Sequence, residues 1–251
     1  MKKYFYGVFV LLLYLNSTNT VAQNNQNSGS ITYSVSLDPF YNSLVKRYKE
    51  ESNKSALHIF KDMAKTASLL ECKLSYNRFQ SKFELENAMG LGGMDKTMFL
   101  AVRSVSKGDY YTDLATQKQI LKDNSSKELY IESKLETINW ELTNDIKQIC
   151  GYICYKALAY EDFENIGKVV ITVWYTPQIP VAFGPKEHVG NLPGLVLEYK
   201  DQMVHFIAKK VVLNPKKTIT IEWPKGKVIT KEDFENQNDF SFSTIKENSR
   251  R

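Results

Sequence analysis

The chain has 251 residues, of which 43% are hydrophobic, 12% aromatic and 24% charged, and its formal net charge at pH 7 is +5. This length can bury a good core in a single domain. Lysines and acidic residues are interleaved without a sustained basic run, which argues against a protein that binds nucleic acid.

The first 22 residues have the three parts of a secretory signal peptide. Lys2 and Lys3 precede an apolar run over residues 4–15, and small residues before Gln23 supply a cleavage site. The apolar run is shorter than the ~20 residues of a membrane-spanning helix, and no later segment comes close. We therefore expect an exported chain, periplasmic or secreted, with no transmembrane segment once it is mature; an uncleaved anchor helix is the alternative. Gln23 stands where a lipoprotein would need cysteine, so we do not expect a lipoprotein.

The N-terminal part of the mature chain predicts a leader, a strand and a helical pair. Residues 23–30 are rich in Asn, Gln and Ser and predict a flexible leader. Apolar and polar residues then alternate from Ile31 to Leu37, which predicts a half-buried strand. Asp38 and Pro39 are suited to the start of a helix. Apolar residues at helical spacing over 40–48 and 56–67 predict two helices or one bent helix.

After residue 70 the pattern is that of strands, with a last helix predicted by Thr230 and Asp233 and a polar tail over 236–251. The turn at Lys200-Asp201-Gln202 makes its neighbouring strands antiparallel. We expect an α+β, mainly β domain over residues 31–235: one large, curved, half-barrel-like antiparallel sheet with two or three helices on one face. The predicted strands are residues 70–76, 79–85, 98–102, 109–114, 119–122, 128–133, 137–142, 152–160, 169–175, 195–199, 203–213 and 218–223.

Three cysteines, Cys72, Cys150 and Cys154, remain in the mature chain. In an oxidising compartment we expect two of them to form a disulfide and the third to stay free, and the sequence does not fix the pair. Cys150 and Cys154 can bond only if Gly151 and Tyr152 make a turn, because an extended strand would hold them too far apart. Their spacing also differs from that of redox and zinc sites, which favours a structural role.

Motifs for catalysis, metals and cofactors are missing from the sequence. The three histidines, His58, His188 and His205, form no His-Glu-x-x-His pair. There is no Gly-x-Ser-x-Gly elbow and no dinucleotide-binding glycine fingerprint. We therefore predict no catalytic residue, no metal and no cofactor. His188 is the one histidine whose loop setting suits a ligand-facing role.

The most distinctive segment covers residues 174–199 and contains four prolines and three glycines. Pro177 and Pro180 must end the preceding strand or lie on an edge, because proline donates no ladder hydrogen bond. A long ordered loop on a sheet is a common place for binding residues. The other interpretation is that the segment covers one end of the core with its apolar residues, which are Ile179, Val181, Phe183 and Leu192.

This segment closely resembles the GLPGLI family of exported Bacteroidota proteins. The family's Trp-Tyr-Thr series falls on residues 174–176, and its Gly-Leu-Pro-Gly-Leu-Ile series falls on residues 191–196. Asn191 replaces the leading glycine, and asparagine is the residue that best tolerates a positive φ after glycine. The strong resemblance covers residues 137–212, and the family implies an envelope protein without an established activity. The motif residues expected to be structural are Trp140, Gly151, Cys154, Pro177, Pro180, Gly184, Pro185, Asn191, Leu192, Pro193, Gly194 and Leu195.

Three hypotheses for the function follow. The leading one is a non-enzymatic binding protein that holds an apolar ligand, lipid or peptide in the concave face of the sheet. The second is an interaction partner of outer-membrane transport machinery, which the family's usual setting suggests and which would use a sheet edge or the proline-rich segment. The third is an enzyme built around His188 or a free cysteine. The residues expected to face a ligand are Trp174, Tyr175, Phe183, His188 and Tyr199.

Overall fold

The structure is a computed structural model that describes residues 28–47, 54–86, 96–123, 129–163, 167–187, 191–234 and 236. The predicted signal peptide, most of the leader, His188 and all of the polar tail except Asn236 lie outside these residues. None of the helices within the described ranges is long and apolar enough to cross a membrane.

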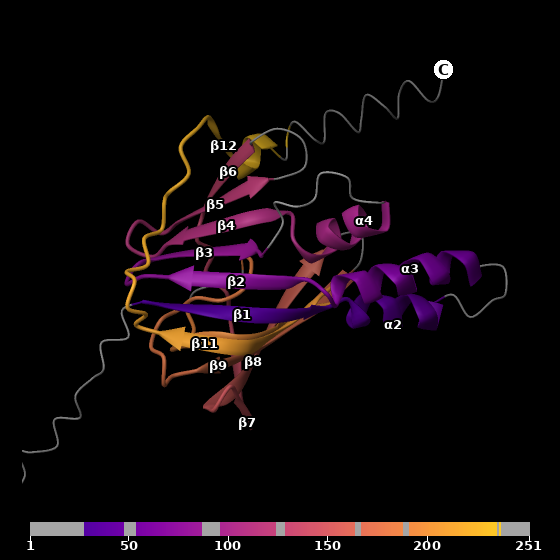
Figure 1. Cartoon of the computed structure of the whole chain (residues 1–251), viewed down its shortest axis with the longest axis horizontal. Helices are drawn as coiled ribbons and strands as arrows, with labels where there is room; N and C mark the ends of the chain where they lie inside the picture. The colour runs from indigo at the N-terminus through magenta and orange to yellow at the C-terminus, as the bar shows by residue number, and fades with distance from the viewer. Residues whose placement is uncertain are drawn as a thin grey trace, which may run out of the picture.

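Twelve strands form a single open, curved sheet (Figure 1). Their order across the sheet is β12-β6-β5-β4-β3-β2-β1-β11-β10-β9-β8-β7. All neighbours are antiparallel except β12 and β6, which are parallel. This is the mainly β, α+β architecture that the sequence predicts. The strands are β1 (Gly29–Ser36), β2 (Glu71–Tyr76), β3 (Gln80–Leu85), β4 (Gly108–Asp113), β5 (Lys118–Asp123), β6 (Leu129–Lys134), β7 (Glu141–Ile149), β8 (Tyr152–Phe163), β9 (Gly167–Thr176), β10 (Leu195–Lys200), β11 (His205–Leu213) and β12 (Val228–Thr230).

The strand nearest the N-terminus lies in the middle of the sheet. β1 pairs with β2 on one side and with β11, near the other end of the chain, on the other. Its alternating pattern has a direct structural cause, since Ile31, Tyr33 and Val35 are buried while Thr32 and Ser34 face the opposite way. We call the face that carries the three buried side chains the inner face and the opposite one the outer face.

Three helices gather at one end of the strands (Figure 1): α2 (Asp38–Arg47), α3 (Lys54–Ala67) and α4 (Lys96–Val105). The predicted helical pair is therefore confirmed. Met63 and Ala67 of α3 are buried in the main core, and Phe40 of α2 packs edge-on against Phe60 of α3 with ring centroids 5.5 Å apart. The helices thus close one end of the inner face with apolar side chains.

Residues 98–102, predicted to form a strand, belong instead to helix α4. A short apolar run has no periodicity that separates a strand from a helix. The helix buries Ala101 and Val105, which lie four residues apart and therefore on one helical face. The strand prediction for this run was therefore wrong.

Two predicted strands near the C-terminal half also need correction. The strand expected at 137–142 begins at Glu141 and continues to Ile149, and residues 135–140 are irregular. The strand expected at 218–223 belongs to no ladder of the sheet. The short parallel strand β12 was not foreseen. The helix start at Thr230 is confirmed, because the Asp233 N–H donates a 3.0 Å hydrogen bond to the Thr230 hydroxyl.

Candidate functional site

The proline-rich segment 174–199 fills the inner face of the sheet. Ile179 and Phe183 are completely buried, Leu192 is nearly so, and the Phe183 ring lies 5.8 Å from the ring of Tyr76 on β2. Backbone hydrogen bonds fix the path of the segment: Leu195 N–H donates to Ile179 C=O at 3.0 Å, and Val196 N–H to Phe183 C=O at 2.9 Å. The apolar residues of the segment therefore close the core, as one of the two interpretations predicts.

His188 lies outside the described residues, and the other four residues expected to face a ligand do not converge on one cavity. Phe183 and Tyr199 are fully buried by the protein's own side chains, and Tyr175 is nearly so. Trp174 is half-buried and points to the outer face, because it pairs in register with Glu198 whereas Tyr175 pairs with Val196. The inner face that the leading hypothesis assigned to an apolar ligand is thus packed with protein.

A partly buried ion pair joins this segment to the residue that follows β10. Lys186 Nζ lies 3.3 Å from Asp201 Oδ2, and the Tyr199 hydroxyl donates to the same oxygen at 2.9 Å. Burial alone would raise the pKa of Asp201, but the Lys186 charge and the N–H groups of Val204 and Met203 hold it below its ordinary value. Asp201 is therefore a carboxylate that anchors both the segment and the turn between β10 and β11.

The motif residues have identifiable backbone roles. β9 ends at Thr176, directly before Pro177, as predicted. Asn191 has a φ of 60°, so asparagine here does adopt the left-handed conformation expected at that position. Gly151 has a φ of 85° in the tight turn between β7 and β8, and Trp140 packs against the main core.

The three cysteines are free thiols in the structure. Cys72 and Cys154 are buried, whereas Cys150 is exposed in the β7–β8 turn. The turn is formed by Cys150 and Gly151, with Tyr152 already in β8, and no bond joins Cys150 to Cys154. The disulfide expected from export is not part of this structure. Burial raises the pKa of Cys154 to about 11, which keeps this thiol protonated near neutrality.

A broad groove lies on the outer face, beneath the connection between β11 and β12. This connection runs past the strands at the end away from the helices (Figure 1). Ile221 joins Tyr111, Ile120 and Tyr130 in a second, smaller core, and Ile219 and Trp223 pack against it. The alternation that predicted a strand at 218–223 thus reflects an extended chain with one buried side, but its side chains rest on the sheet and its backbone pairs with no strand.

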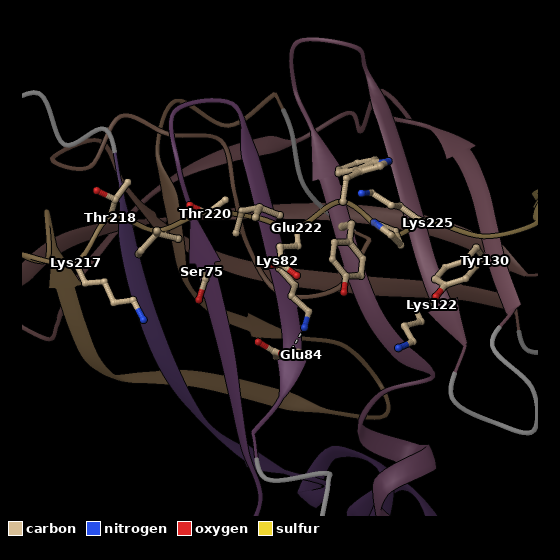
Figure 2. Close-up of a pocket in the computed structure, with 15 residues that line it drawn as sticks. Ser75, Lys82, Glu84, Lys122, Tyr130, Lys217, Thr218, Thr220, Glu222 and Lys225 are labelled. Atoms are coloured by element: carbon tan, nitrogen blue, oxygen red, sulfur yellow. Dashed lines mark hydrogen bonds and ion pairs between the residues drawn. The ribbon is translucent and has the colours of Figure 1, made fainter.

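We call this region the outer groove; its volume is about 1140 Å³. The register of the ladders places its floor residues on the outer face of five consecutive strands, β2 to β6. Because neighbouring strands lie ~4.8 Å apart, the groove is about 19 Å long across the strands. It is lined by Ser75, Lys82, Glu84, Tyr111, Lys122 and Tyr130 and by residues 217–225 (Figure 2).

Charge in the outer groove is mostly positive, with four lysines and two glutamates in the lining. Lys217 and Lys225 lie toward the two ends of segment 217–225, and Lys82 lies between them, where it contacts Glu84 (Figure 2). Neither Lys217 nor Lys225 makes an ion pair with any residue in the described ranges. Two cations are therefore available to a ligand, one toward each end.

The centre of the groove is an internally paired network. Lys82 contacts Glu84, lies 3.5 Å from Asp109, and sits 5.4 Å from the centroid of the Tyr111 ring. Burial acts to lower the pKa of Lys82, but its hydrogen bond to Glu84 and the two carboxylates raise it above its ordinary value. Lys82 therefore stays charged and links Glu84 of β3 to Asp109 of β4 on the floor of the groove. Trp223 and Tyr111 meet edge to face, with centroids 6.1 Å apart.

The backbone of segment 217–225 is the second feature of the groove that could bind a ligand. Among the described residues, no backbone-to-backbone hydrogen bond involves these positions. An extended chain with unpaired N–H and C=O groups can accept a further strand alongside it. Sequence reasoning missed this site because its floor residues lie far apart in the chain; the alternation at 218–223 was its one visible signal. In the part of the chain that is described, no group of three or more His, Cys, Asp or Glu side chains could hold a metal.

The sequence profile of a family described as a protein of unknown function (Porph_ging) matches residues 161–198. This stretch contains all of β9 and all of segment 174–199 except Tyr199, and it is less than half of the chain. No curated protein matches the chain.

Two solved structures of PNGF-II are similar in fold. The structure in space group C2 has a TM-score of 0.50 and 15% sequence identity, and the match covers 81% of this chain and 31% of that one. The structure in space group P21 has a TM-score of 0.52 and 15% identity, with coverage of 84% and 32%. The chain thus spans about a third of the length of PNGF-II. At this identity the similarity shows the fold alone.

Proposed function

We propose that this protein is an exported, non-enzymatic binding protein of the cell envelope that holds an extended acidic peptide in the outer groove. The observation that carries the proposal is segment 217–225, an extended chain whose backbone groups pair with no backbone group of the described residues and which has a lysine at each end. The proposal keeps the binding role expected from the sequence and moves the ligand from the inner to the outer face. The resemblance to the GLPGLI family, which rests on segment 174–199, is part of the same proposal.

The dimensions of the groove suit a short stretch of extended peptide. A strand rises ~3.3 Å per residue, so the about 19 Å across β2 to β6 accommodates about six residues. Backbone pairing with segment 217–225 would supply affinity that is independent of the peptide's sequence. Acidic side chains would then contact Lys217 and Lys225, neither of which forms an ion pair with a carboxylate in the described ranges. Such a peptide belongs naturally to a partner protein, which links this proposal to the interaction hypothesis.

Binding can be measured by NMR, because the chain contains three tryptophans and therefore three indole N–H signals. Trp223 lies in the groove, and its signal is assigned with the Trp223→Phe variant. We expect an eight-residue peptide of alternating glutamate and threonine to shift the Trp223 signal, and the matching lysine–threonine peptide to leave it unchanged. Equal shifts with both peptides, or with neither, would overturn the proposal.

A charge-reversal variant distinguishes binding in the outer groove from attraction by the net charge of the protein. The double variant Lys217→Glu and Lys225→Glu should lower the affinity for the acidic peptide by about tenfold or more, because two attractive charge pairs become two repulsive ones. The matched control is Lys46→Glu with Lys65→Glu, which makes the same charge change at exposed positions on α2 and α3. If the control weakens binding as much as the groove variant does, the peptide senses net charge and not this site.

A further inference from the structure

A second hollow lies on the outer face at the other half of the sheet, over β8, β9 and β10. Its volume is about 450 Å³, and its lining includes Trp174, Val170 and Thr172 of β9. The ladder register places these residues on the same face as the outer groove, with β1 and β11 between the two sites. We call this site the Trp174 hollow. No residue lines both sites, so a ligand of one does not need the other.

The floor of the Trp174 hollow is apolar and partly open. Val170 is 42% exposed, which is unusual for a β-branched residue in the interior of a sheet. Trp174 is half-buried; Lys147 Nζ lies 4.2 Å from the centroid of its ring. Together with Thr172, these side chains form a small apolar surface that the protein's own residues cover only in part.

The carboxylates that line the hollow already have cationic partners outside its lining. Glu198 Oε2 contacts Lys147, and Glu198 Oε1 lies 3.1 Å from His205 Nε2. Asp201 is held by Lys186. Burial would raise the pKa of Glu198, but the hydrogen bonds from His205 and Lys147 hold it below its ordinary value. These acids therefore present little uncompensated negative charge to a ligand.

The lysines that line the hollow are, in contrast, less engaged. Lys200 makes no ion pair with the rest of the described chain. Lys168 lies over the Tyr160 ring at 4.4 Å, a contact that leaves its charge unneutralised. Lys156 contacts Asp145 at 2.9 Å on the exposed β7. The lining therefore has a surplus of positive charge around an apolar floor.

We infer that the Trp174 hollow binds a small amphiphilic anion, in which a phosphate or carboxylate group is joined to an apolar chain or ring. The anionic group would lie between Lys200 and Lys168, where lysine acts as a point charge with three donors. The apolar part would cover Val170 and the open part of Trp174. A volume of about 450 Å³ is in the range of small-molecule sites and too small for a folded partner.

The indole signal of Trp174, assigned with Trp174→Phe, reports on this hollow, while that of Trp223 reports on the outer groove. We expect octyl phosphate to shift the Trp174 signal in a saturable manner and to leave that of Trp223 in place. Inorganic phosphate should shift it at much higher concentration, because it gains no apolar contact, and neutral octyl glucoside should have no effect. Equal responses to octyl phosphate and octyl glucoside would overturn the inference, as would a response of both indoles together.

A lysine substitution tests the anionic part. The double variant Lys168→Gln and Lys200→Gln should lower the affinity for octyl phosphate by about tenfold. Its unfolding midpoint should stay close to that of the parent protein, because both side chains are exposed. The matched control is Lys210→Gln with Lys216→Gln, which removes the same charge from exposed positions outside the hollow. Loss of affinity in the control as well would overturn the site.

A membrane surface would present the same chemistry in another form. Vesicles of phosphatidylglycerol, which carry anionic headgroups on an apolar body, distinguish this source from a free amphiphile. Binding of octyl phosphate together with no sedimentation on such vesicles supports the small-molecule site. Sedimentation on vesicles without a saturable response to octyl phosphate would overturn it in favour of a surface that adheres to membranes. If the acidic peptide did not bind in the outer groove, the expected results for octyl phosphate and for the vesicles would be unchanged.

Discussion

Gly194 lies directly against the backbone carbonyl of Thr176. A Cβ atom at Gly194 would be 2.1 Å from the Thr176 oxygen and 2.8 Å from the nitrogen of Pro177. The two residues bracket the loop over residues 177–193, so the start and the end of this loop touch at this point. Only a residue without a side chain allows β9 and β10 to approach in this way.

Replacement of Gly194 by alanine should therefore destabilise the protein strongly. We expect a loss of about 3 kcal/mol or more in the free energy of unfolding, because backbone has to move to make room. Urea denaturation measures the change. The control is Gly151→Asn, where φ is 85° and no atom lies within 4 Å of an added Cβ, so the cost should be below about 1 kcal/mol. Equal losses in the two variants would contradict the proposed contact.

Two buried tyrosines should respond in opposite ways to removal of their hydroxyl groups. The Tyr33 hydroxyl donates a 2.6 Å hydrogen bond to the Val196 carbonyl, whereas the buried Tyr76 hydroxyl has no partner among the described residues. Tyr33→Phe should cost about 1–2 kcal/mol, since a buried carbonyl loses its donor. Tyr76→Phe should be neutral or stabilising. Thermal and urea unfolding of both variants test this; a larger loss for Tyr76→Phe would contradict the assignment.

The stability of the protein should fall at acidic pH, in part through Glu198. Its folded pKa lies below the ordinary value of 4.5, because its hydrogen bonds to His205 and Lys147 outweigh the effect of burial. The unfolded chain then takes up a proton more readily, so the Glu198 contribution is complete above about pH 4.5 and is lost as pH falls through the folded pKa. We expect Glu198→Gln to show a shallower decline of unfolding free energy between about pH 5 and pH 3. Parallel curves for variant and parent would contradict this.

The thiols should differ sharply in reactivity. Cys150 is exposed, whereas Cys72 and Cys154 are fully buried. In the native protein, a thiol-specific chromogenic reagent at mildly alkaline pH should label Cys150 rapidly and the other two only upon unfolding. Three thiols should react in denaturant, because none is in a disulfide. Cys150→Ser should abolish the fast phase. Only one reactive thiol in denaturant would show that a disulfide has formed.

The centre of the sheet could be predicted from sequence because its strands have one buried face. Ile31, Tyr33 and Val35 alternate with polar residues for that reason. The edge strand β7 gives no such pattern, since Leu142 and Ile146 are 58% and 61% exposed and nearly every residue faces solvent. Its register also shifts between these two residues, which interrupts any alternation. Edge position thus removes the signal on which strand prediction depends.

The binding surfaces could not be predicted because they depend on register between distant strands. Lys82, Tyr111 and Tyr130 become neighbours only through the ladders of β3 to β6. Trp174 was singled out with Tyr175, yet adjacent residues in a strand face opposite ways, so one lines the hollow and the other packs the core. The alternation at 218–223 correctly indicated an extended chain with a buried side. The alternation could not indicate whether this chain pairs with a neighbouring strand or packs its side chains on the face of the sheet.

The position of β1 bears on when this chain can fold. Ser34 donates its hydroxyl hydrogen bond to the carbonyl of Ile207, 173 residues further along the chain. β1 therefore has both of its neighbours only after β11, one of the last strands, has been synthesised. Closing the long loop between β1 and β11 costs conformational entropy. A ribosome would have to synthesise most of the sequence before the sheet could be completed. Folding of the complete sheet should therefore follow synthesis of β11 and not accompany it.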